Sequence, residues 1–105
     1  MAADQYHEPP KELSQETRTF ARMITSLIEE AEAINWYEQR ISVEKDDDAK
    51  AIMQNAQKEE LKHFSMDLEF LIRKKKEWGD IMKIVLFSGK KDIVKQGEIA
   101  EEEAD

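Results

Sequence analysis

Two long stretches without glycine or proline carry apolar residues at helical spacing, and they constrain the fold more than any other feature of the chain. In residues 13–41 the apolar positions recur every three or four residues, at Phe20, Ile24, Leu27, Ala31, Ile34 and Ile41. This pattern predicts one amphipathic helix, with Glu38 filling its single gap. Ser14 is a suitable N-cap, although Thr17 stands where a full capping box has Glu or Gln.

A second periodic stretch, 49–75, follows a polar break at 42–48 in which Asp46 to Asp48 are cap candidates. The short link predicts that the two helices pack antiparallel as a hairpin. The pattern breaks around Trp78-Gly79, and apolar residues between Ile81 and Phe87 predict a short third helix that Ser88-Gly89 ends. We therefore expect an all-α fold of two long antiparallel helices and a short C-terminal helix.

The two ends are predicted to lie outside this hairpin. Residues 1–12 contain His7-Glu8-Pro9-Pro10, and because each proline disfavours a helical predecessor we expect a flexible segment. Residues 13–89 form the helical hairpin with its short third helix. Residues 90–105 close on three successive glutamates, have too little apolar content to fold, and are predicted to be an acidic mobile tail.

Composition restricts the possible functions. The 105 residues suit one small domain, and the absence of cysteine excludes a thiolate nucleophile and any Cys-ligated zinc or iron–sulfur site. A net charge of −8 argues against nucleic acid or an anionic membrane as partner and favours cations. Without an apolar run of membrane-spanning length or a signal-peptide pattern, we expect a soluble intracellular protein.

One hairpin of this length leaves most of an apolar face in water, so we expect self-association on packing grounds alone. Two hairpins would make a four-helix bundle.

Three ionisable residues lie where apolar packing is expected. Glu30 follows Leu27 by three positions, and Glu60 precedes Phe64 by four. His63 follows Glu60 by three, so both project from one face of the second helix. An unpaired buried carboxylate is costly, and a metal ion would be a suitable partner.

Glu60-Leu61-Lys62-His63 is a Glu-x-x-His element, and Glu30 is a lone carboxylate on the facing helix. Carboxylate-bridged di-iron bundles use a Glu from each of two helices and a Glu-x-x-His from each of the other two. One chain holds half of this set, and a symmetric dimer would complete it. The four glutamates would balance two divalent ions. Alternatively, the Glu-x-x-His element is an ordinary solvated face and Glu30 extends its head to water.

Glu29, Glu32 and Trp36 share a second stripe of the first helix. They could form an outer cation relay that feeds Glu30, or a polar face with an interface tryptophan. His7 lies beside two prolines and is not expected in the site.

The sequence resembles the encapsulated ferritins. Residues 29–40 match their signature, reading Glu-Glu-Ala-Glu-Ala-Ile-Asn-Trp-Tyr-Glu-Gln-Arg. Further similarities cover about residues 7–90: His7-Glu8-Pro9, Asn55, Glu59-Glu60-x-x-His63, Met66-x-Leu68-Glu69 and Leu86-Phe87.

This resemblance implies a dimer that recreates a ferritin-like four-helix bundle with a ferroxidase centre of two iron ions at its interface. Glu30 would bridge the metals, and Glu60 and His63 would be terminal ligands. The family's outer metal-uptake site would correspond to Glu29, Glu32 and Trp36, with Ca²⁺ or another divalent cation as ligand. Tyr37 would lie next to the metal ligands without binding metal itself.

Dimers of the family associate into a ring, expected here to be a decamer, which oxidises Fe(II) inside an encapsulin nanocompartment in the cytoplasm. The encapsulin shell protein is therefore an expected partner. Family members usually carry a Gly/Leu-rich docking peptide or are fused to the shell protein, and residues 90–105 contain no such peptide.

Two other functions fit parts of the sequence. One is a rubrerythrin-like peroxidase or an oxidase for another metal, although no rubredoxin-type cysteine pair is present. The other is a non-catalytic acidic helical adaptor in which the Glu-x-x-His element is incidental.

Overall fold

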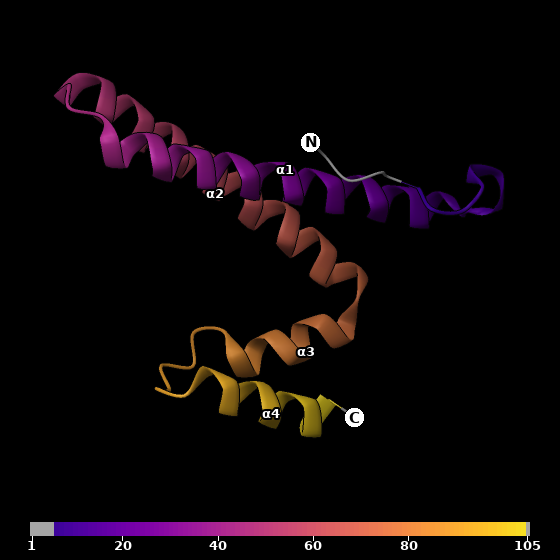
Figure 1. The fold of residues 1–105 in the computed structure, drawn as a ribbon. Helices are drawn as coiled ribbons and strands as arrows, with labels where there is room; N and C mark the ends of the chain where they lie inside the picture. Colours follow the sequence, from indigo (N-terminus) through magenta and orange to yellow (C-terminus); the bar gives the residue numbers. More distant parts are fainter. Residues whose placement is uncertain (1–5, 105) are drawn as a thin grey trace. The chain divides into compact units, whose positions relative to one another are not determined.

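The computed structural model describes residues 6–104, and within this range the chain is all-α, as the sequence predicts. A 3₁₀ turn, Pro10–Glu12, precedes four α-helices: α1 (Gln15–Val43), α2 (Asp47–Lys74), α3 (Lys76–Val85) and α4 (Ile93–Ala104) (Figure 1). Among these described helices, none is both long and apolar enough to cross a membrane. The chain divides into two compact units, one ending at Glu69 and the other beginning at Phe70.

The start of α1 confirms the predicted N-cap. The Ser14 Oγ accepts a hydrogen bond from the Thr17 backbone N–H at 3.1 Å and donates one to the Thr17 Oγ1 at 2.9 Å. This satisfies one of the free amide donors of the first turn. The helix ends at Val43, and the Glu44 carboxylate accepts hydrogen bonds from the two amides that follow it.

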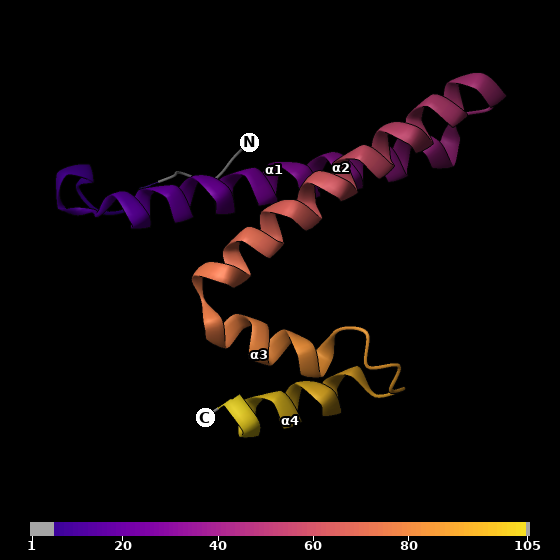
Figure 2. The same cartoon turned by 180° about the vertical axis from the view of Figure 1, so that it is seen from behind.

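The predicted antiparallel hairpin is also present. Asp46 caps α2, because its Oδ1 accepts a hydrogen bond from the Ala49 N–H at 2.9 Å. Farther along, the Gln57 Nε2 donates to the Ile34 carbonyl at 3.1 Å and to the Glu38 carboxylate at 3.0 Å. Figure 2 shows the two helices running in opposite directions from the turn that joins them. Glu38, the polar gap in the apolar pattern of α1, thus has a partner on α2.

The hairpin buries few hydrophobic side chains between its two helices. Among the described residues, the fully buried hydrophobic side chains are Leu71 and Ala100, and both belong to the second unit. Along α1 and α2, several large apolar side chains are at least half exposed: Trp36, Val43, Ile52, Leu61 and Met66. A surface with this much exposed apolar area is typical of a helix pair that packs against a further partner.

In the second unit, the break between helices differs from the prediction. We expected it at Trp78-Gly79, but it falls at Lys75, and both Trp78 and Gly79 lie inside α3. Gly79 lies close to the end of α2, since a Cβ at this position would stand 3.1 Å from the Ile72 Cγ2. The glycine therefore reflects close helix packing, which a local reading of the sequence cannot separate from a helix break.

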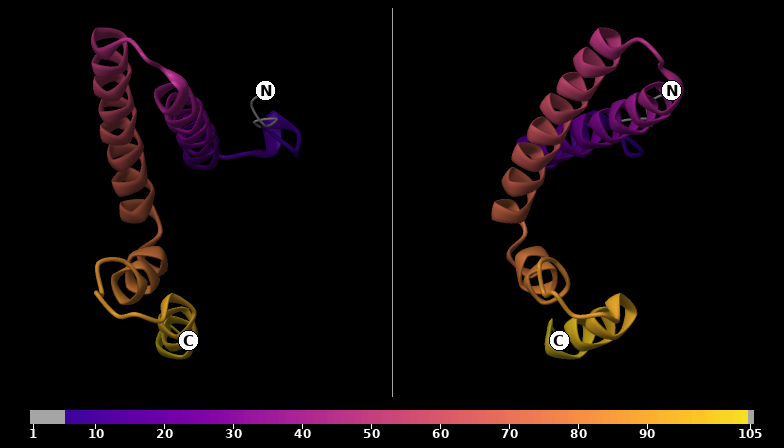
Figure 3. Two further views of the ribbon diagram at one scale, coloured as in Figure 1. Left: turned by 60° about the vertical axis from the view of Figure 1, so that its left-hand side comes forward. Right: turned by 90° about the vertical axis from the view of Figure 1, so that its left-hand side faces the viewer.

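The expectation that residues 90–105 cannot fold is corrected by α4, which lies beside α3 (Figure 3). Asp92 caps it, because its Oδ1 accepts a hydrogen bond from the Lys95 N–H at 2.9 Å. Ala100, 1% exposed, is the buried contact residue of this helix. The low apolar content of this segment therefore did not exclude a helix, because α4 has a neighbouring helix to pack on.

The N-terminal segment also contains some structure. Pro10–Glu12 form one 3₁₀ turn, and the Arg18 guanidinium donates a hydrogen bond to the Pro10 carbonyl, which ties this turn to α1. Proline suits the first position of such a turn because its missing N–H would have no partner there. Residues 1–5 of the segment that we predicted to be flexible, and residue 105 of the tail, lie outside the described range.

We predict that Ala100→Glu detaches α4. Burying a charge at a position with no space for it is strongly unfavourable. Amide hydrogen exchange should therefore accelerate at least about tenfold across Ile93–Ala104 while the hairpin keeps its protection. Val94→Glu is the matched control, since it adds the same charge at a side chain that is 73% exposed. Equal protection of α4 in both variants would contradict this packing.

Candidate functional site

The site predicted from Glu30, Glu60 and His63 lies along the facing sides of α1 and α2. Glu30 is half-buried on α1, and its nearest acidic neighbours on α2 are Asp67 and Glu60. The antiparallel register places Glu30 between these two residues, because Gln57 of α2 bonds to residues 34 and 38 of α1. The structure therefore brings Glu30 and Glu60 together.

The carboxyl groups of Glu30 and Asp67 face each other closely enough to share a hydrogen bond. The Oε2 of Glu30 and the Oδ2 of Asp67 are both buried and have no hydrogen-bond donor among the described residues. Two ionised carboxylates can only accept hydrogen bonds, so this contact requires a proton or a cation between them. Burial, the hydrogen bond to Asp67 and the negative charges of Asp67, Glu60 and Glu29 raise the pKa of Glu30 to about 7.

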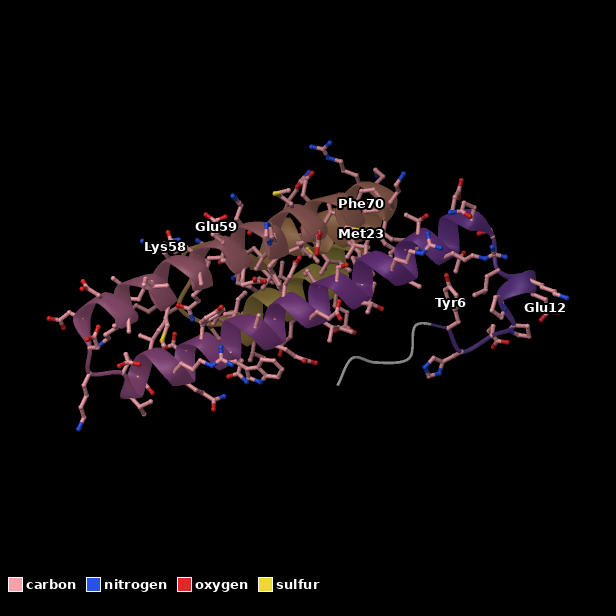
Figure 4. The ribbon with its side chains drawn as sticks, turned by 90° about the horizontal axis from the view of Figure 1, so that it is seen from above. Tyr6, Glu12, Met23, Lys58, Glu59 and Phe70 are labelled. Carbon is pink, nitrogen blue, oxygen red and sulfur yellow. The ribbon has the colours of Figure 1, made fainter. Side chains whose placement is uncertain are left out.

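His63 does not join this cluster within one chain. Its side chain is exposed, and its charge acts on Glu59. The Glu59 carboxylate pairs with the Lys62 ammonium at 2.7 Å, which lowers the pKa of Glu59. In Figure 4, Glu59 points away from α1. Among the described residues of a single chain, no three His, Asp or Glu side chains converge into a metal-binding group.

The residues of the predicted outer site lie around the same part of α1. Glu29 is exposed and its charge reaches Glu30, whereas Glu32 is half-buried. Trp36 is 50% exposed. Tyr37 is half-buried, and the Arg40 guanidinium carbon lies 5.4 Å from its ring centroid. A role of these side chains in cation uptake stays a prediction.

Asp67 is the site residue that sequence reasoning missed. It follows His63 by four positions and Glu60 by seven, so the three lie on one side of α2. The spacing was readable from the sequence. The contact with Glu30 was not, because it depends on the register between the two helices.

The raised pKa of Glu30 predicts how stability depends on pH in the absence of metal. Between its ordinary value of 4.5 and about 7, the folded chain holds a proton on Glu30 that the unfolded chain loses. The free energy of unfolding should therefore fall as pH rises through this window and level off above it. Urea unfolding in a chelator, at fixed protein concentration from pH 5 to 8, measures this dependence.

Glu30→Gln should lose this component of the pH dependence, because its amide does not titrate. Glu59→Gln should keep it, since the Glu59 side chain is exposed and its pKa is shifted in the opposite direction. The same slope in the wild type and in Glu30→Gln would assign the pH dependence to another group.

Comparisons with known proteins agree with this fold. The sequence profile of the EncFtn-like family matches residues 5–89. A protein of Thermotoga maritima named ferritin-like protein is 42% identical over 88 residues, which cover 84% of this chain and 77% of that protein.

Two further relatives are informative. An encapsulated ferritin-like protein of Rhodospirillum rubrum is 38% identical over 82 residues, which cover 78% of this chain and 59% of that protein. The crystal structure of a protein from Nitrosomonas europaea superposes with a TM-score of 0.78 at 42% identity, covering 83% of this chain and 96% of that one. The resemblance to encapsulated ferritins is therefore confirmed, and the chain belongs to the EncFtn-like family.

Proposed function

We propose that this protein is a ferroxidase that oxidises Fe(II) to Fe(III) at a di-iron site formed between two copies of the chain. The observation that carries this proposal is the Glu30–Glu60 face, where a half-buried carboxylate is surrounded by negative charges. Iron is the substrate, and one chain supplies only part of the ligand set. Membership of a ferritin-like family supports iron as the metal.

The exposed side of α2 supports the pairing of two copies. His63 stands in a strip between Ile52, which is 70% exposed, and Met66, which is 61% exposed. The spacing of eleven and three residues keeps these side chains on one side of the helix. A second copy that covers this apolar strip would also bury His63, and would turn it from a solvated residue into a ligand beside Glu60.

The side chains suit the reaction. Carboxylate oxygens and imidazole nitrogen are suitable ligands for Fe(II), and anionic oxygen ligands stabilise Fe(III) more than Fe(II). In the proposed dimer, the Glu30 carboxylate of each copy bridges the two ions, while Glu60 and His63 are terminal ligands. Each Fe(II) then gives one electron to O2. Glu29 and Glu32, with Trp36 beside them, would deliver cations to the centre and could hold Ca²⁺. Tyr37 would lie next to the metal ligands without binding metal itself.

At the level of assembly, we propose a ring of dimers, expected to be a decamer, held inside an encapsulin nanocompartment in the cytoplasm. The name of the Rhodospirillum rubrum relative supports the shell as a partner. In this arrangement the ring oxidises iron and the shell stores the product. We do not expect nucleic acid or a membrane as partner.

Glu30→Ala and His63→Ala should each reduce Fe(II) oxidation to the uncatalysed background. Each removes one ligand type from both halves of the proposed site. The initial rate of Fe(III) formation under air, followed by absorbance, measures this. Glu98→Gln is the matched control and should keep the wild-type rate, because Glu98 lies on α4, is exposed and pairs locally with Lys95. A wild-type rate in either ligand variant would refute the assignment.

Metal and assembly should be coupled. Without metal, the acidic residues of two copies repel one another across the proposed interface, and divalent ions remove this repulsion. Anaerobic addition of Fe(II) should therefore raise the molar mass measured by size-exclusion chromatography with light scattering, and His63→Ala should blunt this change. A mass that does not respond to Fe(II), in a chain that binds no Fe(II), would favour the non-catalytic adaptor.

A further inference from the structure

Asp67 is a half-buried acid whose position the proposed ligand set does not explain. It faces Glu30 across the α1–α2 contact, and its Oδ2 is buried with no hydrogen-bond donor among the described residues. An asparagine there could donate a hydrogen bond to Glu30, whereas the aspartate adds a second negative group.

The charges that act on the facing Glu30 carboxyl group are of the same sign. The charges that act on Glu30, from Asp67, Glu60 and Glu29, are all negative. Like charges held together out of water destabilise the fold unless a proton or a cation lies among them. We therefore attribute the presence of an aspartate at position 67 to cation binding and not to stabilisation of the hairpin.

Helical spacing places Asp67 in the same group as the predicted ligands of α2. It lies one turn beyond His63 and two turns beyond Glu60. We propose that Asp67 supplies a further carboxylate to the cation that Glu30 holds, so that each chain brings three carboxylates and one imidazole to the site. This inference rests on the proposed function and deepens it.

The additional carboxylate changes the charge of the site. Two copies would bring six carboxylates, which two Fe(II) ions leave partly unbalanced and two Fe(III) ions neutralise. Asp67 therefore strengthens the preference of the site for the oxidised ion.

The test is a titration of the full chain with Co(II), which reports binding by calorimetry and ligand geometry by its visible absorption. Asp67→Asn keeps the shape of the side chain and removes its charge. We expect its Co(II) affinity to fall about tenfold or more, with an altered absorption spectrum. Glu98→Gln, which removes an exposed carboxylate from α4, should bind as the wild type does.

The stability of the metal-free variant distinguishes a metal-binding role of Asp67 from a purely structural role. Asp67→Asn replaces a pair of carboxyl groups that needs a proton between them with an amide that can donate a hydrogen bond to Glu30. Its melting temperature without metal should therefore be equal to or higher than that of the wild type. If the variant does not fold, Asp67→Ser is titrated instead. Unfolding of both variants would show that the fold needs this carboxylate, and would overturn the inference.

The remaining outcomes distinguish the inference from the function on which it rests. Unchanged affinity in Asp67→Asn, or reduced affinity with an unchanged spectrum, would remove Asp67 from the metal while leaving the di-iron proposal intact. Failure of the wild type to bind Co(II) and Fe(II) would overturn the proposed function itself.

Discussion

The hairpin of α1 and α2 has almost no interior, and the rest of the proposed biology depends on this constraint. Two amphipathic helices can bury one stripe against each other, but the flanks of both stripes stay in water. In this chain those flanks carry Trp36, Ile52 and Met66, each at least half exposed. The hairpin is therefore best understood as half of a bundle, and its acids as half of a site.

The acids themselves act against the fold of the metal-free chain. Glu30 and Asp67 occupy a contact where apolar residues would pack more favourably, and burial keeps the pKa of Glu30 near 7. A cation that takes the place of this proton would also offset the negative charges around Glu30. Weak local packing and readiness to bind a cation thus have the same physical origin.

The features that the sequence predicts well are local ones. Ser14 and Asp46 cap their helices as expected, because a cap depends on residues three positions apart. The errors come from contacts between elements. Gly79 marks close packing on Ile72 and not a break, and α4 forms beside α3 with Ala100 buried.

In the candidate site too, the sequence predicts local features better than contacts between helices. Helical spacing and the family resemblance point to Glu30, Glu60 and His63, and the structure brings the two glutamates together. The contact of Asp67 with Glu30 depends on the register between α1 and α2, which helical spacing does not encode. The arrangement of His63 depends on a second copy, so neither one sequence nor one chain can show it.

The hydrogen bonds of Gln57 restrict sliding of α1 and α2 along each other. Apolar stripes tolerate a shift along the axis, since one aliphatic contact can replace another. The Gln57 amide does not tolerate such a shift. Its hydrogen bonds to the Ile34 carbonyl and the Glu38 carboxylate would both break if α2 moved by one turn, about 5.4 Å. Such a slip would also change which acids of α2 lie beside Glu30. These two hydrogen bonds thus favour the register in which Glu30 lies between Glu60 and Asp67.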